Sequence, residues 1–335
     1  MELSFLYLFR SQSPFLTLQP PQKPVLLFCR RNHDKEKLKN LLANLKTEKD
    51  CRTLYYYLSK RMENENELKD LFDRHYHLIG KSHNKVRNLK VAIAGLGGSG
   101  STAATAIVKM GFTNIILSDF DIVEPANVAN QSYNYDQIGK KKTEALKENL
   151  LKINPFIKIT IFEGISEKNV DEFVKNADIV IDAMDSYRAK VILSRALKRH
   201  KKWCIHISSY GWRASLTCIP PTKSYEELFS LPSLGRPLSE VSDEEFAEHR
   251  KKIVKIIGKN MYPKSIFKEP AKLKHPLFNL YPSGMLSGIL AAFETYKFAI
   301  GKKNKMIVIP RFLKIDLMFN KYQLSNFKSK IKNKK

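Results

Sequence analysis

The sequence has little cysteine, and none of it is arranged in the pairs that hold structural zinc. Four cysteines are spread over 335 residues, and no two of them form a C-x-x-C pair. Structural zinc sites draw their ligands from such closely spaced residues, so we expect no structural zinc. Scattered thiols in a long chain are typical of a reducing compartment, which argues against a disulfide-stabilised secreted fold.

Long apolar runs are lacking as well. None reaches the roughly 18 residues that a membrane span needs, so we expect no membrane partner. Residues 1–33 hold two short apolar stretches broken by Arg10 and by prolines, with Glu2 where a secretion signal carries positive charge. We therefore expect a cytoplasmic protein. Because this segment is poor in acidic residues, an organelle transit peptide is the alternative.

Acidic residues are scarce relative to basic ones. Aspartate and glutamate total 33 against 58 for lysine and arginine, which gives a formal net charge of +25. A field of this sign attracts polyanions such as nucleotides, RNA, anionic lipids and acidic proteins. An AT-rich coding bias, which favours Lys, Asn and Ile, gives the same excess. The net charge alone therefore does not decide whether the protein binds a polyanionic partner.

The remaining chain has enough apolar residues, 43%, to bury a core. Residues 34–80 are highly charged with leucines at helical spacing, and from about residue 88 strands and helices alternate. Short apolar runs predict strands buried on both faces at residues 91–94, 114–117, 157–162, 178–181 and 203–207. Helices are expected between them, at residues 99–111, 139–152, 168–176 and 186–201. This order predicts an α/β fold with a doubly wound, Rossmann-like, mostly parallel sheet and helices on both faces.

The alternation stops after residue 219. Residues 220–282 form a long excursion with several prolines and a charged helix near 242–258, and such excursions are often functional. A helix at 284–300 follows, capped by Gly301, and then two short C-terminal strands at 305–309 and 312–318, which we expect to be antiparallel. The chain is thus divided into three parts: a partly helical extension (1–70), a nucleotide-binding domain (71–322) and a solvated lysine-rich tail (323–335).

A glycine-rich loop directly follows the first expected strand. Gly95, Gly97, Gly98 and Gly100 permit a tight turn and the close approach of a phosphate, and the helix that begins there presents unpaired N–H groups to it. Asp119 ends the second strand, where an acid hydrogen-bonds ribose hydroxyls. These features predict a nucleotide site, but they fit NAD and ATP equally.

Two further charged segments lie near the expected site. The lysines at 140–142 open a helix, where positive charge opposes the helix dipole; a bound phosphate would remove that repulsion, and a solvated basic face is the alternative. Asp182 and Asp185 end the fourth strand, at the edge of the sheet where ligands bind. One of them could hold Mg²⁺, which prefers oxygen ligands. The alternative is that Asp185 or Ser186 caps the next helix.

With these motifs together, the sequence resembles the ThiF/MoeB/HesA family, the bacterial relatives of ubiquitin-activating enzymes. The similarity covers roughly residues 70–320, with matching segments at residues 73–80, 95–100, 119–131, 139–142, 153–155, 178–185 and 283–297. The resemblance implies an ATP-dependent adenylyltransferase, in which a carboxylate attacks the α-phosphate of ATP and pyrophosphate leaves. It implies as substrate the C-terminal glycine of a ubiquitin-like or sulfur-carrier protein, or a peptide. A tRNA-borne carboxylate is the alternative.

Carried over by position, the resemblance gives individual residues a role. Lys142 would offset charge on the phosphates, and Asp185 would hold Mg²⁺. Arg74 matches an arginine that reaches the γ-phosphate in the other subunit, which implies a homodimer with shared sites. The implied ATP-binding residues are Gly95, Gly97, Gly98, Gly100, Asp119, Asp121, Asn127 and Lys142.

The sequence departs from the family pattern in two respects. Asn130 stands where the family carries a phosphate-binding arginine, and loss of one such donor costs about 2.7–4 kcal/mol of transition-state stabilisation. Lys140, Lys141 or a basic residue of segment 220–282 would then have to substitute; otherwise the chain is a catalytically weak nucleotide-binding partner subunit. Some members also use a cysteine, but residues 220–282 contain none. Cys204 is expected to be buried in a strand, which leaves Cys218 as the thiol candidate.

Overall fold

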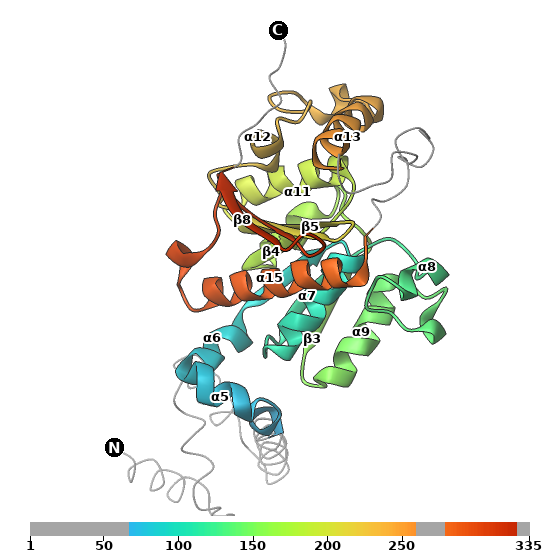
Figure 1. The fold of residues 1–335 in the computed structure, drawn as a ribbon. Helices are drawn as coiled ribbons and strands as arrows, with labels where there is room; N and C mark the ends of the chain where they lie inside the picture. Colours follow the sequence, from blue (N-terminus) through green and yellow to red (C-terminus); the bar gives the residue numbers. More distant parts are fainter. Residues whose placement is uncertain (1–66, 259–278, 327–335) are drawn as a thin grey trace, which may run out of the picture. The chain divides into compact units, whose positions relative to one another are not determined.

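The computed structural model describes residues 67–258 and 279–326 (Figure 1). The chain divides into two compact units, Met1–Arg74 and His75–Lys335. In the described part of the first unit, Leu68 and Phe72 are buried. The helices expected over residues 34–66 and the tail after residue 326 lie outside the described residues. The architecture below is that of the second unit.

An eight-stranded sheet forms the centre of the second unit, in the order β3-β2-β1-β4-β5-β6-β7-β8. The parallel strands are β1 (Lys90–Ala94), β2 (Asn114–Ser118), β3 (Lys158–Phe162), β4 (Ile179–Asp182) and β5 (Trp203–Tyr210). The antiparallel strands are β6 (Arg213–Ile219), β7 (Arg311–Asp316) and β8 (Lys321–Asn326). The expected doubly wound, mostly parallel sheet with antiparallel C-terminal strands is confirmed.

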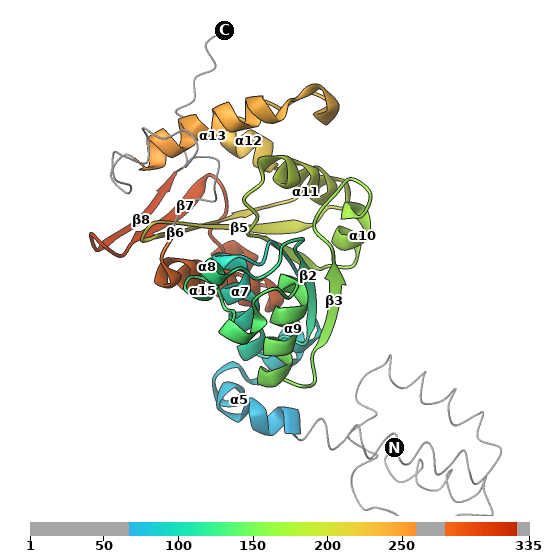
Figure 2. The same ribbon diagram turned by 90° about the vertical axis from the view of Figure 1, so that its right-hand side faces the viewer.

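Helices cover both faces of this sheet (Figure 2). One face carries α6 (His83–Asn88), α7 (Gly98–Lys109), α9 (Lys142–Ile153) and α15 (Tyr281–Ala299). The other carries α10 (Val170–Lys175), α11 (Tyr187–Arg199), α12 (Tyr225–Phe229) and the start of α13 (Asp243–Gly258). Because the inner parallel strands β1, β2 and β4 meet a core on each face, both sets of their alternating side chains must be apolar. This is why these strands are nearly unbroken apolar runs in the sequence. The edge strand β3, by contrast, exposes Lys158 and Thr160.

Short helices occupy the connections. They are α5 (Asp73–Ile79), α8 (Pro125–Val128) and the 3-10 helices η1 (Gly80–Ser82), η2 (Tyr135–Gln137), η3 (Leu238–Glu240) and η5 (Lys303–Lys305). Within residues 67–258 and 279–326, no helix combines the length and the apolar character needed to cross a bilayer.

Helix α15 returns to the N-terminal turns of α7. A Cβ atom on Gly288 would lie 2.4 Å from Thr102 Oγ1, so only a glycine allows the two helices to come this close. Thr102 Oγ1 also donates a hydrogen bond to the Gly284 carbonyl at 3.0 Å. The C-terminal helix is therefore packed beside the helix that the glycine loop begins.

The segment before β7 differs from the expectation. Residues 305–309 were expected to form a strand, but they contribute only an isolated bridge between Cys218 and Val308. The Cys218 N–H donates to the Ile307 carbonyl at 2.7 Å. The run has the apolar composition of a strand. The next hydrogen bond of this parallel pairing would come from the N–H of residue 220, and Pro220 has none, so the bridge stays isolated.

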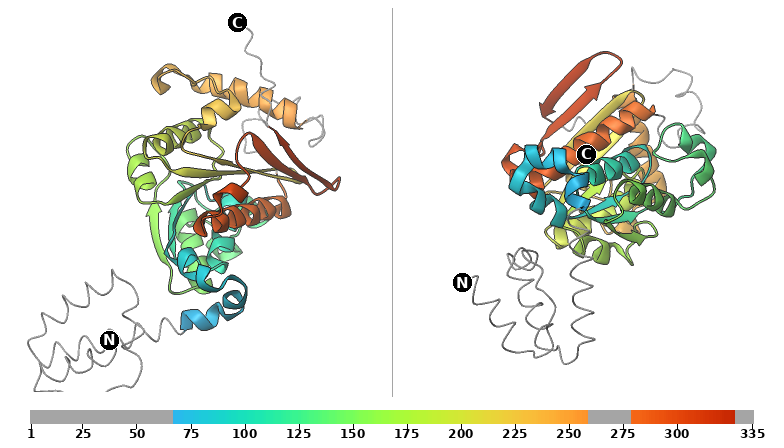
Figure 3. Two further views of the ribbon diagram at one scale, coloured as in Figure 1. Left: turned by 90° about the vertical axis from the view of Figure 1, so that its left-hand side faces the viewer. Right: turned by 90° about the horizontal axis from the view of Figure 1, so that it is seen from below.

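Strands β7 and β8 form a hairpin at the edge of the sheet, shown in red in Figure 3. Strand β8 continues through residue 322, where the nucleotide-binding domain was expected to end. The described part of the expected tail is thus a regular edge strand. Its side chains are exposed along its whole length.

Candidate functional site

The glycine loop and the end of β4 meet where the strand order reverses. Strand β1 has β2 on one side and β4 on the other. Ligands of doubly wound sheets bind at the carboxyl ends of the strands that flank such a switch point. The Ala183 N–H donates to the Ala94 carbonyl at 2.9 Å, which joins the exit of β4 to the start of the glycine loop. Two loops that the sequence placed at the site are therefore neighbours.

Three of the loop's four glycines, Gly95, Gly98 and Gly100, leave no room for a Cβ atom, and Gly97 does. Gly95 has a φ angle of +86°, and a Cβ on it would lie 2.8 Å from Ala183 backbone atoms. A Cβ on Gly100 would lie 1.8 Å from the Gly95 carbonyl oxygen. By contrast, the nearest atom to a Cβ on Gly97, Nε2 of Gln131, would be 4.0 Å away. Gly97 is the N-cap of α7, and no side chain caps this helix. The open space therefore lies at a helix N-terminus, which favours an anion.

Asp119 fastens the glycine loop to the end of β2. Its two carboxylate oxygens accept the N–H of Leu96 at 2.6 Å and that of Asp121 at 2.8 Å. Burial raises the pKa of the Asp119 carboxyl, and these two hydrogen bonds oppose the rise. The Tyr133 hydroxyl donates to the Leu96 carbonyl at 2.8 Å and holds the loop from the other side. Each carboxylate oxygen keeps a lone pair for a ribose hydroxyl, but ribose binding stays a prediction.

Lys142 is the first residue of α9, and its side chain is only 7% exposed. Its ammonium forms an ion pair with the Asp121 carboxylate at 2.8 Å. Burial raises the pKa of both Asp119 and Asp185, and the charge of Lys142 opposes this rise, so it acts on the ends of β2 and of β4. An ammonium has three N–H donors, and this ion pair uses one of them. Asp121 thus orients the lysine to which the resemblance gives a phosphate contact.

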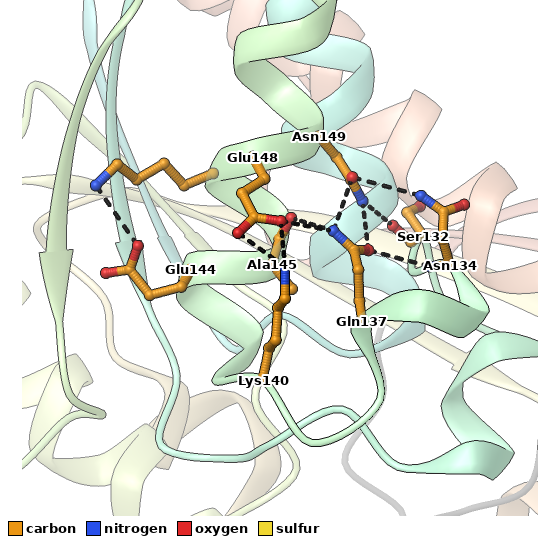
Figure 4. A network of polar contacts seen from close by, with 9 residues as sticks. Ser132, Asn134, Gln137, Lys140, Glu144, Ala145, Glu148 and Asn149 are labelled. Atoms are coloured by element: carbon orange, nitrogen blue, oxygen red, sulfur yellow. Dashed lines mark hydrogen bonds and ion pairs between the residues drawn. The ribbon is translucent and has the colours of Figure 1, made fainter.

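A polar network anchors the loop before α9 on that helix (Figure 4). Gln137 is 1% exposed, and its amide donates to the Ala145 carbonyl at 3.0 Å and to Asn149 Oδ1 at 2.9 Å. Lys140, in the loop before α9, forms an ion pair with Glu148 of α9 at 2.9 Å. These contacts fix the start of α9, and with it the position of Lys142's backbone.

Asn127 has a structural task in the short helix α8. Its Oδ1 accepts the Glu124 N–H at 3.0 Å, which caps the first turn. The oxygen of the side chain is therefore engaged, and the amide nitrogen is the group left to face a ligand. Its phosphate contact stays a prediction.

The two carboxylates at the end of β4, those of Asp182 and Asp185, have different surroundings. Asp182 is buried between Lys190 Nζ and His206 Nδ1, each 2.9 Å from the carboxylate. Burial would raise the pKa of Asp182, but the Lys190 charge and the His206 hydrogen bond outweigh it and lower the pKa to about 2. Burial also lowers the pKa of His206. Asp182 is thus a structural ion-pair partner, which leaves Asp185 as the metal-ligand candidate.

Asp185 is exposed, and its carboxylate takes no part in capping the next helix. Ser186 caps α11, because its Oγ accepts the Ala189 N–H at 3.3 Å. The alternatives for helix capping left by the sequence are therefore decided in favour of Ser186. The surrounding protein raises the pKa of the Asp185 carboxyl, and nearby cations, Lys190 foremost, oppose the rise.

A single exposed carboxylate suits Mg²⁺ when phosphate oxygens and water complete the coordination. Asp185 therefore fits this role through the chemistry of its donor atoms. Among residues 67–258 and 279–326, no group of three or more His, Cys, Asp or Glu side chains is placed to hold a metal by itself.

Asn130, at the family's arginine position, lies over the glycine loop. Its carbonyl oxygen would be 2.9 Å from a Cβ on Gly98. Two of the expected substitutes for the arginine are committed elsewhere: Lys140 is paired within the network of Figure 4, and Lys141 forms an ion pair with Glu163. Neither lysine therefore takes the place of the missing arginine in this structure.

The basic residue expected from segment 220–282 has a candidate in Arg250. Its charge opposes the rise in the pKa of the Asp185 carboxyl, so its electrostatic field reaches the site. The helix that carries it, α13, is fastened to α11 by Arg188. The Arg188 guanidinium donates to Asp243 Oδ1 at 2.7 Å and to the Val241 carbonyl at 2.5 Å.

Cys218 does not have the surroundings of a reactive thiol. It is fully buried, and its Sγ lies 3.6 Å from Glu294 Oε2. Burial and the charge of Glu294 raise the pKa of the Cys218 thiol well above its usual value, so the thiolate is disfavoured. These surroundings argue against Cys218 as the reactive thiol, and a thiol role for it stays an untested prediction. Cys204 is buried as expected, and Arg74 lies on α5 at the end of the first unit, where its role stays a prediction.

Sequence reasoning missed the polar residues that support the site. Tyr133 holds the glycine loop, and Asn279 and Ser209 lie next to Asn130 through a short hydrogen-bonded path. The Asn130–Asn279 contact spans 149 positions, so no local pattern announces it. The one available signal was the place of Asn279, just before the closing helix of the domain.

Comparison with known proteins decides between the nucleotide-binding families that this geometry allows. The ThiF family profile matches residues 72–335, most of the chain. The chain belongs to the ThiF family.

Similar curated proteins are the ubiquitin-like modifier-activating enzymes 5. The one from Dictyostelium discoideum is 31% identical over 169 residues, which cover 43% of this chain and 44% of that protein. The one from Arabidopsis thaliana is 29% identical over 219 residues, which cover 55% and 51%. This ThiF-family chain thus spans about half the length of the curated relatives it matches.

Solved structures share the fold. PaaA aligns with a TM-score of 0.59 at 20% identity, over 78% of this chain and 84% of that one. Escherichia coli MccB, solved with AMPCPP and MccA, aligns with a TM-score of 0.57 at 22% identity, over 87% and 81%. At these identities the likeness shows the fold alone.

Proposed function

We propose that this ThiF-family chain is an ATP-dependent adenylyltransferase that activates the C-terminal carboxylate of a ubiquitin-like protein, a sulfur-carrier protein or a peptide. One observation carries the proposal: a single edge of the sheet offers an open helix N-terminus at Gly97, an oriented ammonium on Lys142 and an exposed carboxylate on Asp185. These are the donors, the cation and the metal ligand that a triphosphate requires. Relatives named as ubiquitin-like modifier-activating enzymes, and MccB solved with an ATP analogue and MccA, support it.

In the proposed reaction, a carboxylate oxygen of the substrate attacks the α-phosphorus of ATP. The bond from that phosphorus to the bridging oxygen breaks, and pyrophosphate leaves with the electron pair. Asp119 would bind the ribose, while Lys142 and the first turn of α7 would offset charge on the phosphates. Asp185 would hold a Mg²⁺ ion, which neutralises triphosphate charge when bound. No base is needed, because a carboxylate is already ionised at neutral pH.

Further features of the family are part of this proposal. We infer a homodimer in which Arg74 of one subunit serves the nucleotide of the other, and a cytoplasmic location. The segment 220–282 would border the substrate's tail, and Arg250 would add positive charge near Asp185.

Pyrophosphate exchange into ATP tests the proposal. Exchange should depend on Mg²⁺ and on a protein or peptide that ends in a free carboxylate, and it should vanish with Lys142→Met. No exchange with any ubiquitin-like or sulfur-carrier protein of the same organism would contradict it.

A catalytically weak nucleotide-binding subunit is the second candidate, and the Asn130 departure favours it. In that case the chain binds ATP without exchange, and Asn130→Arg restores exchange. Robust exchange by the wild-type chain rules this candidate out.

A tRNA-modifying activity is the third candidate, favoured only by the net charge of +25. It requires tRNA binding that weakens steeply with salt, because bound cations displace counterions from the phosphates. Absence of such binding rules it out.

A further inference from the structure

A chain of polar side chains leads from Asn130 to the first turns of α7 and α15. Asn130 Nδ2 donates to Asn279 Oδ1 at 3.4 Å, and Asn279 Nδ2 donates to Ser209 Oγ at 2.5 Å. The hydroxyls of Ser209 and Ser99 lie 3.1 Å apart. The Ser287 hydroxyl donates to Ser99 at 2.8 Å. Five side chains from separate parts of the sequence are thus coupled beside the glycine loop.

One atom at the end of this chain has no partner. Asn130 Oδ1 is buried, and no donor reaches it from the part of the protein that the structure describes. A buried acceptor without a donor is unfavourable, so such an atom calls for an explanation. The backbone carbonyl oxygen of the same residue, Asn130, and the side-chain amide nitrogen of Asn279 flank Gly98, at 2.9 and 3.3 Å from a Cβ built there.

The donor and acceptor roles along this row of hydrogen-bonded side chains can all be exchanged together. A half-turn of both amides exchanges their oxygen and nitrogen atoms, which occupy nearly the same space. Ser209 then donates to Asn279 Oδ1, Asn279 donates to Asn130 Oδ1, and Asn130 Nδ2 takes the unpartnered position. The serines permit either direction, because a hydroxyl can both donate and accept. In the reversed direction the unpartnered atom is an N–H donor beside the glycine loop.

We propose that Asn130 is a neutral phosphate ligand whose amide is oriented by Asn279, and that the pair takes the place of the family's arginine. The inference rests on the proposed function, since it requires that ATP occupies the glycine loop. A phosphate oxygen accepts a hydrogen bond from Asn130 Nδ2 and so satisfies the group that is otherwise unpartnered. Asn279 is a positioning residue, because the orientation of its amide against Ser209 decides in which direction these hydrogen bonds run.

Titrations with ATP and with adenosine test this assignment, because adenosine lacks the phosphates. We expect Asn130→Ala and Asn279→Ala each to weaken ATP binding about tenfold, the effect of losing one hydrogen bond to a charged group. The double variant should be no weaker than the weaker single variant, because the two residues act as one unit. Adenosine binding should stay within about twofold of wild type in all three.

Asn176→Ala is the matched control. It removes an exposed amide at the C-terminal end of α10, on the other face of the sheet from α7, and should leave both titrations unchanged. A second measurement guards against a merely structural role of Asn279. In an Asn130→Arg background, where the guanidinium supplies its own donors, Asn279→Ala should no longer affect ATP binding.

Four results would overturn the inference while leaving the proposed function intact. They are wild-type ATP affinity in Asn279→Ala, additive losses in the double variant, equal weakening of ATP and adenosine, and an undiminished effect of Asn279→Ala in the Asn130→Arg background. Failure of the wild-type chain to bind ATP would instead overturn the proposed function itself.

Discussion

Replacing Gly97 of the glycine loop by alanine should weaken ATP binding while leaving the stability of the protein nearly unchanged. Gly97→Ala places a methyl group at a point where the nearest atom of the surrounding protein, Gln131 Nε2, is 4.0 Å away, and the backbone angles there, φ −70° and ψ −156°, are extended. Replacing a glycine at a compatible position gains about 0.4–1 kcal/mol by restricting the unfolded chain. Losing glycine at an N-cap costs about 0.5–1 kcal/mol. The two effects nearly cancel, so the free energy of unfolding should change by less than about 1 kcal/mol.

ATP binding should respond quite differently to the same change. If the open space over Gly97 receives a phosphate, the added methyl group crowds the ligand, and overpacking of this kind costs about 1–3 kcal/mol. ATP affinity should therefore fall roughly tenfold to a hundredfold. Urea unfolding and calorimetric ATP titration of the same preparation measure both quantities.

Gly100→Ala provides the contrasting variant. Its Cβ would lie 1.8 Å from the Gly95 carbonyl oxygen, so the protein should unfold at much lower urea. Wild-type ATP affinity in Gly97→Ala would refute our placement of the phosphates. A stability loss in Gly97→Ala as large as that of Gly100→Ala would refute the packing distinction itself.

Three other predictions concern the charges and the thiol. Asp185→Asn should lower pyrophosphate exchange about a hundredfold with little effect on unfolding, and raised Mg²⁺ should partly restore the rate; an unchanged rate contradicts the metal role. Cys218→Ala should leave exchange unchanged, since the thiol is buried; loss of exchange in a stable Cys218→Ala protein would reinstate the thiol. Asp182 has a folded-state pKa of about 2, below its usual 3.8, so the stability it contributes is complete above pH 4 and is lost as the pH falls towards 2. Asp182→Asn should therefore cost about 3–5 kcal/mol at pH 7, by leaving Lys190 unpaired, and should reduce the acid loss seen in urea unfolding; an unaltered pH profile contradicts this.

The fold was largely predictable because its signals are local. Each inner parallel strand is largely an apolar run, and helices between the parallel strands begin and end near their expected positions, as α11 (Tyr187–Arg199, expected at residues 186–201) shows. Residues 305–309 were misassigned because a short apolar run looks alike whether it pairs along its length or only packs. The pairing there is limited to Cys218 with Val308, which depends on a strand far away in the sequence.

The site was predictable only in part. Glycine spacing located the loop, and the strand ends located Asp119 and Asp185. The sequence did not indicate which of the two carboxylates forms an ion pair, because Lys190 and His206 reach Asp182 from other elements. Asn279 and its bond to Asn130 were hidden for the same reason: side-chain hydrogen bonds between distant segments leave no periodic trace in the sequence.

Trapping of the activated carboxylate tests the central claim most directly. The chain is incubated with ATP, Mg²⁺, hydroxylamine and a ubiquitin-like or sulfur-carrier protein that ends in Gly-Gly, and the carrier is analysed by mass spectrometry. The account predicts a hydroxamate at the carrier's C-terminal glycine together with AMP and pyrophosphate, and no product with Lys142→Met. ATP cleavage to ADP and phosphate, or tight ATP binding with no hydroxamate on any such carrier, would contradict it.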